Sequence, residues 1–264
     1  MKRIVFSDID GTLLDSEHKM TPLTEKAVKK LISEDVPFVI ISARSPSGIY
    51  PILKEYGFNC PIVSYSGALM LDENRNILFS KGIRKAEAKK IIGYIGKSCP
   101  DVTWCVYAID QWIVSDKNDP NVLREESIVR TYAVQGTVDD AESDEINKIL
   151  CVCDPDKIDR LENDIKGMFP DCSVVKSCGF LLEIMANGVS KGMAAEKMCG
   201  FLNVPVENAA AFGDSYNDES MLERVGFGVL MGNAPDELKK RIKRHTLDND
   251  HDGIYHALSE MKWI

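Results

Sequence analysis

The sequence predicts an α/β fold in which a doubly wound parallel sheet is interrupted by an inserted α+β module. In the first third of the chain, short apolar runs alternate with segments whose apolar residues recur at helical spacing. Between about Gly82 and Asn187 the pattern changes to pairs of strands beside helices, and from Ser190 the first pattern returns. We therefore predict a core formed by residues 1–82 and 188–264, and an inserted α+β domain formed by residues 83–187.

The first part of the chain alternates short apolar strands with helices. Thr21 and Pro22 form a favourable helix start, because a hydroxyl can cap the first turn and proline fits inside it. Ala27 and Leu31 then recur at helical spacing and give this helix an apolar face. The predicted elements are strands at Arg3–Phe6, Phe38–Ile41 and Pro61–Ser64, helices from Pro22 and from Pro46 to near Gly57, and a hairpin of Leu69–Leu71 with Ile77–Phe79 around a polar turn.

The other two parts supply the remaining predicted elements. Those of the inserted domain are a helix at Lys85–Lys97, strands at Val102–Tyr107 and Gln111–Val114, a polar helical stretch, a strand at Ile149–Val152, a helix at Pro155–Met168, and strands at Ser173–Lys176 and Leu181–Met185. Those after Ser190 are a helix that includes Ala194–Leu202, a strand at Ala209–Phe212, a short helix that includes Ser220–Arg224, a strand at Phe227–Met231, and closing helices at Pro235–Arg244 and His256–Met261.

The composition excludes some classes of partner. The chain has 32 Lys and Arg residues against 41 Asp and Glu residues, which gives a net charge of −9 at pH 7. Overall charge therefore does not attract this protein to nucleic acid or to an anionic membrane. No apolar run approaches the length of a membrane-spanning helix. A ligand that carries phosphate must depend on local groups: a metal ion, a few Lys or Arg side chains and backbone N–H groups.

The cysteines are interpreted as reduced thiols that pack as small hydrophobic residues. They include no C-x-x-C pair and show no zinc-like spacing. The eight positions are Cys60, Cys99, Cys105, Cys151, Cys153, Cys172, Cys178 and Cys199. Met1–Arg3 leads directly into a predicted core strand, without a secretory apolar region. These features predict a cytoplasmic protein.

Two aspartates follow the first strand. Strand side chains alternate between faces, so Asp8 and Asp10 are expected to project to one side while Ile9 enters the core. Ligands of an open α/β sheet bind at the carboxyl ends of its strands, where these residues fall. Two carboxylates held so close repel each other unless a cation lies between them or one of them holds a proton. The pair therefore indicates Mg²⁺ together with an acid/base role, the alternative being an Asx-rich turn after an edge strand.

A second acidic group follows the predicted strand at Ala209–Phe212. Mg²⁺ prefers oxygen ligands in octahedral geometry and usually keeps some water. Asp8, Asp214 and the backbone carbonyl of Asp10 would leave positions for water and for a phosphate oxygen. Asp218 suits a supporting role outside this set of ligands. The alternative for this segment is a solvated acidic loop or a helix cap.

Three other positions suit phosphate binding. Lys191 falls in the first turn of a predicted helix, where its charge opposes the helix dipole, so it is either an exposed lysine or a group that neutralises phosphate and carboxylate together. Ser42 and the neighbouring N–H groups would hold a phosphate oxygen at a helix start. Arg44 could reach the phosphate or pair with an acid, and both possibilities stay open.

The remaining polar clusters are interpreted as structural. Asp248, Asp250, His251 and Asp252 match no common ligand spacing, so we expect a polar loop there. His18 and His256 are expected on the surface or as satisfied core residues.

Together these segments resemble the motifs of the haloacid dehalogenase-like hydrolases, and more narrowly the Cof-type phosphatases with a large type IIB cap. The motifs occur in order at Asp8-Ile9-Asp10-Gly11-Thr12, Ser42, Lys191 and Gly213-Asp214-Ser215-Tyr216-Asn217-Asp218, with the insert between the second and the third. Ser42-Ala43-Arg44 stands where the family often has Thr-Gly-Arg, and the hydroxyl remains. Ser66-Gly67-Ala68 replaces a frequent Asn-Gly-Ala and lacks the asparagine side chain.

The resemblance implies a Rossmann-like core, a cap that closes over the site, and Mg²⁺-dependent hydrolysis of small phosphorylated metabolites, sugar phosphates first. Asp8 would attack phosphorus and become an aspartyl phosphate, while Asp10 would act as acid and then as base. The residues implied for phosphate binding are Ser42, Ala43, Arg44, Lys191 and Asn217. Those implied as metal ligands are Asp8, Asp10 and Asp214, with Asp218 and Thr12 supporting these ligands. The protein is expected to be a monomer or a dimer.

Two other functions use similar residues. A phosphate-accepting receiver module also places acids, a hydroxyl and a lysine on a parallel sheet, although the large insert and Asp10 argue against it. A phosphosugar mutase would use the same core and pass the phosphoryl group to a second position on the sugar. Repeated turnover distinguishes an enzyme from a receiver, and phosphate moved intact within a sugar identifies a mutase.

Overall fold

The computed structural model describes residues 2–264, with Cys178 described by its backbone alone. These residues form two compact units. The first unit contains the chain up to Ser42, Leu53–Leu78 and Ser190–Ile264, and the second contains Ala43–Ile52 and Phe79–Val189. The predicted domain boundaries, residues 1–82 and 188–264 around 83–187, stay a prediction. They lie close to the units along most of the chain but assign residues 43–52 to the core.

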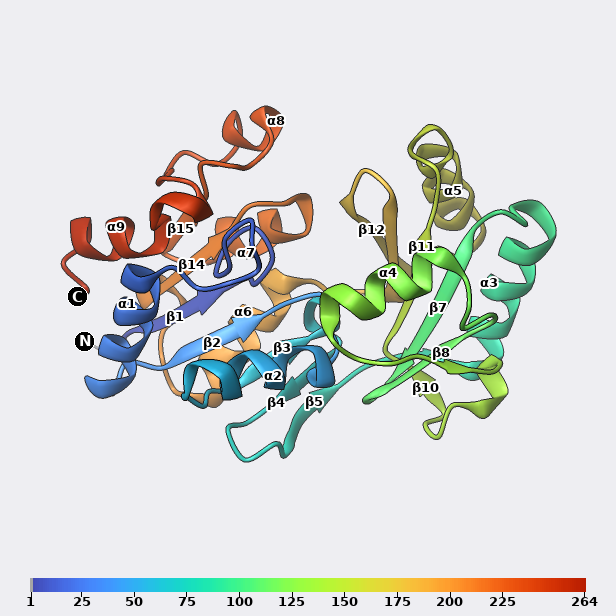
Figure 1. Cartoon of the computed structure of the whole chain (residues 1–264), viewed down its shortest axis with the longest axis horizontal. Helices are drawn as coiled ribbons and strands as arrows, with labels where there is room; N and C mark the ends of the chain where they lie inside the picture. The colour runs from blue at the N-terminus through green and yellow to red at the C-terminus, as the bar shows by residue number, and fades with distance from the viewer. Residues whose placement is uncertain (1) are drawn as a thin grey trace. The chain divides into compact units, whose positions relative to one another are not determined.

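The first unit is built on a seven-stranded sheet in the order β15-β14-β1-β2-β3-β4-β5. Neighbouring strands run parallel from β15 to β3, and β4 is antiparallel to β3. Its strands are β1 (Ile4–Ser7), β2 (Phe38–Ile41), β3 (Ile62–Ser64), β4 (Leu69–Leu71), β5 (Ile77–Ser80), β14 (Ala209–Gly213) and β15 (Phe227–Leu230). Figure 1 shows β1 between β2 and β14, inside this sheet. The parallel α/β prediction is confirmed.

The helices of this unit are α1 (Pro22–Ser33), α6 (Lys191–Phe201), α7 (Glu219–Arg224), α8 (Asp236–Lys239) and α9 (Gly253–Glu260). Helix α2 (Pro46–Tyr56) begins in the second unit and belongs to the first from Leu53. Helix α1 contacts β2 and α9, and α6 contacts α7. The inner strands consist mainly of apolar residues because both faces are covered: Ile4, Val5 and Phe6 of β1 are fully buried.

The second unit contains a six-stranded sheet in the order β12-β13-β11-β7-β8-β9. Its strands are β7 (Thr103–Ala108), β8 (Gln111–Val114), β9 (Val134–Gln135), β11 (Lys148–Val152), β12 (Cys172–Cys178) and β13 (Leu181–Ala186), and a two-stranded ladder joins β6 (Ile83–Arg84) to β10 (Glu145–Ile146). Its helices are α3 (Lys85–Ser98), α4 (Pro120–Val129) and α5 (Pro155–Met168). Figure 1 shows α3 and α5 on the same side of the sheet. The α+β prediction for this part of the chain is confirmed.

Two local predictions are wrong. The hydroxyl of Thr21 does not cap α1, because it donates to the Asp252 carboxylate far along the chain. The closing helix expected at Pro235–Arg244 ends at Lys239. The chain then turns so that Leu230 can accept a hydrogen bond from the backbone N–H of Thr246.

The seven cysteines whose side chains are described are free thiols, and five of them are buried. Burial raises the pKa of Cys60 and of Cys105 to about 12, so both thiols stay protonated at neutral pH. The interpretation of these residues as small hydrophobic side chains is confirmed for the described thiols, while Cys178 lies outside them. Within residues 2–264, every helix is too short or too polar to cross a membrane.

Candidate active site

The first acidic pair lies in the loop directly after β1. The backbone N–H of Asp8 donates to the carbonyl of Phe212 in β14, 3.0 Å away, so the neighbouring strand holds the start of this loop. Asp8 is buried, Ile9 is fully buried, and the side chain of Asp10 is 46% exposed. The strand itself ends at Ser7, one residue before the carboxylates. Asp8 therefore faces a protected environment and Asp10 an open one.

Lys191 is the buried cation of this cluster. It occupies the first turn of α6, where Ser190 caps the helix by accepting a hydrogen bond from the backbone N–H of Met193. Its Nζ lies 2.8 Å from Oδ1 of Asp8 and 2.6 Å from Oδ1 of Asp218. The exposed alternative is wrong, because the Lys191 side chain has no exposed surface. The two carboxylates compensate for its burial and for its unfavourable place at the helix start.

Asp218 is fully occupied by hydrogen bonds. One oxygen accepts from the Lys191 ammonium, and the other accepts from the backbone N–H groups of Asp214 and Ser215 at 3.0 and 2.9 Å. Gly213 makes this arrangement possible, because a Cβ there would meet the Asp218 carboxyl carbon at 2.4 Å. Asp218 thus positions both Lys191 and the loop that carries Asp214.

Asp214 lies beside this pair and has a free oxygen. Its Oδ1 accepts a hydrogen bond from the Thr12 hydroxyl at 2.8 Å. Gly11, with a φ of +76°, lets the loop pass so close that a Cβ would lie 2.5 Å from Oδ2 of Asp214. Asp8, Asp214 and Asp218 offer carboxylate oxygens that all lie within 4.8 Å of one another. Asp218 accepts three hydrogen bonds through both of its oxygens, whereas Asp8 and Asp214 each use one oxygen, so these two side chains are more available to a cation.

The crowding shifts the protonation of this cluster. Burial raises the pKa of Asp8 well above its ordinary value, Lys191 opposes the shift, and Asp218 and Asp214 add to it. Burial and the charge of Asp218 raise the pKa of Asp214 to about 7. Burial would lower the pKa of Lys191, but Asp218 and Asp8 together raise it. Three carboxylates thus face one ammonium, and the cluster lacks positive charge.

The backbone after β2 is held at Ser42. Its N–H donates to the carbonyl of Val63, and its carbonyl accepts from the N–H of Ser66, both at 2.9 Å. Tyr65 and Ser66 both adopt the left-handed conformation, with φ of +53° and +54°, and Gly67 follows with a φ of +116°. Such strain in residues other than glycine is concentrated at functional sites. Ser66 therefore contributes its backbone here, at the place where the asparagine of the family motif is missing.

The prediction that Ser42 and the neighbouring N–H groups hold a phosphate oxygen stays a prediction. At the start of α2, the N–H of Ser47 donates to Oδ1 of Asp110 at 2.8 Å and that of Gly48 donates to Ser45. Among the described residues, the N–H of Ala43 has no hydrogen-bond partner. Arg44 is buried and one of its contacts is to the carbonyl of Gly48, 3.4 Å away.

Asn217 presents an unsatisfied polar atom. It lies in the short 3₁₀ turn Tyr216–Asp218, and its Oδ1 is buried without a hydrogen-bond partner among the described residues. Buried polar atoms without a partner are rare in folded proteins and call for a ligand, an ion or water. Asn217 is thus placed next in the chain to Asp218 with unused hydrogen-bonding capacity.

Two asparagines that bind the first loop were not predicted, and His18, expected on the surface or in the core, is exposed. The side-chain amides of Asn233 and Asn249 donate to the carbonyls of Gly11 and Leu14, at 2.8 and 2.9 Å. Nδ1 of His18 lies 3.9 Å from Oδ1 of Asp10. Both asparagines come from the last part of the chain, and no spacing in the sequence links them to the loop. Their side-chain amides, in loops of the last part of the chain, are the sequence feature that could have suggested these contacts.

The segment Asp248–Asp252 forms a polar loop and not a metal site. Its side chains are used locally: Asp248 pairs with His251, and Asp250 accepts from the backbone N–H of Ser16. Within the part of the chain that the structure describes, it forms no group of ligands close enough to share an ion. His256 is exposed, as expected.

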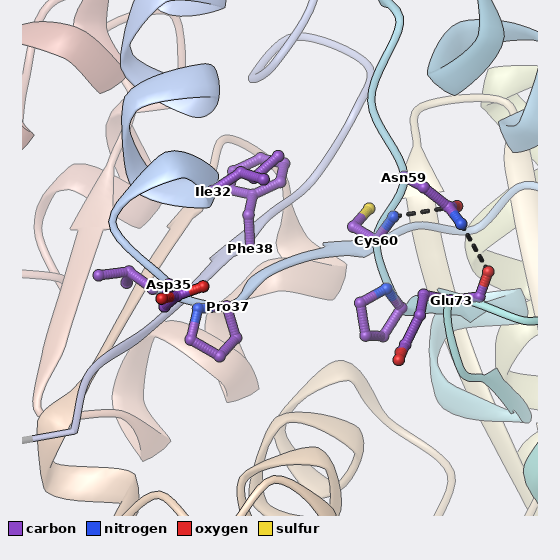
Figure 2. A pocket seen from close by; sticks show the side chains of 9 residues that line it. Ile32, Asp35, Pro37, Phe38, Asn59, Cys60 and Glu73 are labelled. Atoms are coloured by element: carbon purple, nitrogen blue, oxygen red, sulfur yellow. Dashed lines mark hydrogen bonds between the residues drawn. The ribbon is translucent and has the colours of Figure 1, made fainter.

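A pocket of about 240 Å³ lies at the opposite ends of the core strands. Its lining includes Pro37 and Phe38 at the start of β2 and Cys60 and Pro61 just before β3. Figure 2 shows the Asn59 side chain bonded to the backbone of Cys60 and of Glu73 at its edge. The acidic cluster follows the carboxyl ends of β1 and β14, so this pocket is separate from the candidate site.

Comparisons with known proteins agree with this geometry. A family model described as haloacid dehalogenase-like hydrolase matches residues 5–258. A relative from Haemophilus influenzae named "Putative phosphatase" is 34% identical over 260 residues, which cover 98% of each chain. The crystal structure of TM0651 from Thermotoga maritima has a TM-score of 0.83 and 26% identity, and the match covers 98% of this chain and 97% of that one. The HAD subclass IIB sugar phosphatase BT4131 matches in fold over 99% of this chain and 100% of its own, with a TM-score of 0.87 and 21% identity.

Proposed function

We propose that this protein hydrolyses small phosphate monoesters with the help of Mg²⁺ and through an aspartyl phosphate. The chain belongs to the haloacid dehalogenase-like hydrolases and is a Cof-type phosphatase. The observation that carries this proposal is the buried ammonium of Lys191 between Asp8 and Asp218, with Asp214 beside them. Such a cluster suits a ligand that brings a cation and a phosphate together.

The acidic cluster fits a magnesium ion. Asp8 and Asp214 are hard oxygen donors within reach of each other, and burial first, then the neighbouring carboxylates, raise the pKa of both. We propose that both side chains and the backbone carbonyl of Asp10 hold the ion. Asp218 and Thr12 would keep Asp214 in position through hydrogen bonds to its backbone N–H and its carboxylate. When bound, Mg²⁺ would supply positive charge to the oxygens of the transferring phosphoryl group.

The proposed reaction has two steps. In the first, an oxygen of Asp8 forms a bond to phosphorus, the bond from phosphorus to the ester oxygen breaks, and Asp10 gives its proton to that oxygen. In the second, Asp10 takes a proton from a water molecule whose oxygen attacks phosphorus, and the bond to Asp8 breaks. The open environment of Asp10 supports this role, because the residue must meet both the leaving group and water.

The remaining site residues are proposed to bind the phosphoryl group. Lys191 neutralises its charge from the buried side, and the Asn217 side chain completes its hydrogen bonds there. Ser42 with the free N–H of Ala43 would also hold a phosphoryl oxygen, with Arg44 nearby in the chain. These assignments follow the family motifs residue by residue.

Small phosphorylated metabolites are the proposed substrates, sugar phosphates first. The fold relative named as a sugar phosphatase supports this choice. The net charge of −9 disfavours nucleic acid and membrane surfaces as partners. We propose a cytoplasmic enzyme, monomeric or dimeric, and the free thiols fit a reducing compartment.

A panel of phosphorylated metabolites tests this function. Purified protein with Mg²⁺ should release inorganic phosphate repeatedly from a chromogenic ester, and from one or a few sugar phosphates at higher kcat/KM. A single stoichiometric phosphorylation without turnover would instead indicate a receiver-like acceptor. Transfer of the phosphoryl group to a second position of the sugar would indicate a mutase.

Replacing Asp10 by alanine is expected to slow both steps. General acid–base catalysis contributes about 10²–10⁴-fold, so kcat should fall by a factor in that range. Stopped-flow measurement of the alcohol burst and steady-state release of phosphate would report the two steps separately. An unchanged rate in either step would exclude Asp10 from that step, and Asp15→Ala in the same loop serves as the control.

Magnesium is expected to stabilise the protein against heat. A ligand that binds only the folded state at one hundred times its Kd adds about 2.7 kcal/mol to the free energy of unfolding. Calorimetry with and without MgCl₂ should therefore show a higher Tm with the ion, and Asp214→Asn should lose most of that increase. Asp236→Asn, which changes an exposed carboxylate, should keep it. An equal increase in both variants would place the ion elsewhere.

A further inference from the structure

The segment Ala43–Ile52 belongs to the second unit, although it follows β2 of the first. It starts directly after Ser42 and includes the beginning of α2. Two side chains from the second unit hold its backbone: Lys148 at Ala43 and Asp110 at Ser47. The proposed phosphate loop, Ser42–Arg44, and the helix start after it are therefore held by residues that the catalytic motifs do not include.

Lys148 makes the first of these contacts. It is the first residue of β11, it is only 4% exposed, and its Nζ donates to the carbonyl of Ala43 at 2.6 Å. The ammonium also lies 4.7 Å from the centre of the Tyr107 ring, within cation–π distance. Burying a lysine is unfavourable unless its charge is compensated, and a hydrogen bond from a charged donor is stronger than a neutral one.

This contact fixes the orientation of one peptide group. A trans peptide is planar, so its C=O and N–H point in opposite directions, and holding the carbonyl of Ala43 also sets the direction of the N–H of Arg44. The preceding carbonyl, that of Ser42, is held by the N–H of Ser66. Two successive carbonyls are thus committed, while the N–H of Ala43 between them has no partner among the described residues. The N–H of Ala43 is therefore available to donate a hydrogen bond to an anion.

Asp110 holds the same segment at Ser47, and the residue before it is supported from beside Lys148. It follows Ile109, whose φ of +54° is strained for a β-branched residue. The N–H of Ile109 donates to Oδ1 of Asn147 at 2.7 Å, and Asn147 is the neighbour of Lys148 in the chain. One short stretch, Asn147–Lys148, therefore supports both contacts.

We propose that Lys148 is a positioning residue for phosphate binding. By holding the carbonyl of Ala43, its ammonium keeps the Ser42–Arg44 backbone in the conformation that receives the anionic phosphoryl group, and it adds positive charge one residue from Ser42. Asp110 supports the same conformation by holding the N–H of Ser47. This inference rests on the proposed function, because it assigns the loop to phosphate. A lysine that served only stability would leave phosphate affinity unchanged.

Lys148→Met tests the proposal, because methionine keeps most of the side-chain volume and removes the charge. We expect KM for a chromogenic phosphate ester and the inhibition constant of inorganic phosphate to rise about tenfold each, the ratio that 1.4 kcal/mol produces. kcat should change less than about threefold, and Lys148→Arg should restore most of the affinity. Lys176→Met is the matched control, since it removes a lysine of β12 that pairs with Asp159 and Glu162.

A second measurement does not need turnover. Inorganic phosphate with Mg²⁺ should raise the Tm of the wild type and of Lys176→Met, and raise that of Lys148→Met much less. Asp110→Ala, at a more exposed position, should show an intermediate loss and provides the test if Lys148→Met does not fold. Unchanged phosphate affinity in Lys148→Met, or equal losses in both lysine variants, would overturn the inference. Loss of phosphate stabilisation in a protein that hydrolyses no ester would support the inference and contradict the proposed function.

Discussion

Replacing Asp8 by asparagine is expected to abolish hydrolysis while the protein stays folded. Asparagine keeps the shape of the side chain, and its carbonyl can still accept a hydrogen bond from Lys191, which lies 2.8 Å from the present carboxylate. It cannot form the acyl phosphate, so kcat should fall by about 10⁴-fold or more. The measurement is phosphate release from a chromogenic ester at saturating Mg²⁺.

The same substitution is expected to leave the metal-free protein as stable as the wild type, or more stable. Asp8 is buried and is repelled by Asp218 and Asp214, so removing its charge relieves part of that repulsion. Thermal unfolding without metal should show a Tm no lower than that of the wild type. Substantial hydrolysis by the folded variant would remove Asp8 as the nucleophile, and a large fall in Tm would show that its carboxylate is structural.

Replacing Lys191 by methionine is expected to cause the largest loss of stability at this site. The ammonium is enclosed by Asp8 and Asp218, and without it two buried carboxylates would face each other. Removing one partner of a buried pair costs about 3–5 kcal/mol because the other charge is left uncompensated. Urea unfolding of the metal-free protein at neutral pH would measure this loss, and activity should be lost as well.

The double variant Lys191→Met with Asp218→Asn identifies the cause. It removes one of the uncompensated charges, while the asparagine oxygen can still accept from the N–H groups of Asp214 and Ser215. We expect it to recover part of the stability that the single variant loses. Lys29→Met, which breaks an exposed pair with Glu25, should cost less than about 1 kcal/mol. Equal losses in the two lysine variants would show that burial of the Lys191 ion pair is not the source of the effect.

Local patterns were sufficient to predict most of the fold. The helix α5 begins and ends where its apolar spacing predicted, at Pro155 and Met168, and the buried strands β1, β2 and β14 were recognised by their apolar runs. Predictions failed where a distant residue decides the local structure. Thr21 bonds to Asp252 instead of capping its own helix, and the chain leaves the helical path after Lys239 to pair near Leu230. Neither partner is visible from a local window of sequence.

The sequence was sufficient to predict which residues form the site, but not which of them contact one another. Strand ends indicated Asp8 and Asp214, because parallel strands bring their carboxyl ends to one edge of the sheet. The burial of Lys191 depends on two carboxylates from other segments, so its helix position alone suggested an exposed side chain. Lys148 carries no motif, and its contact with Ala43 joins residues that are about one hundred positions apart. Contacts between side chains so far apart in the sequence can be identified only from a structure.

The position of β1 between β2 and β14 has a consequence for synthesis of the chain. Ile4 pairs with Ala209, so the strand that precedes Asp8, the proposed nucleophile, lacks one neighbour until residue 209 has been added. The sheet of the second unit, in contrast, lies entirely within Phe79–Val189 and can form earlier. Lys191 and Asp214 are translated after that stretch. A nascent chain therefore carries Asp8, the proposed nucleophile, through a long stretch of elongation without the ammonium of Lys191, and we expect catalytic competence only after Asp214 has been added.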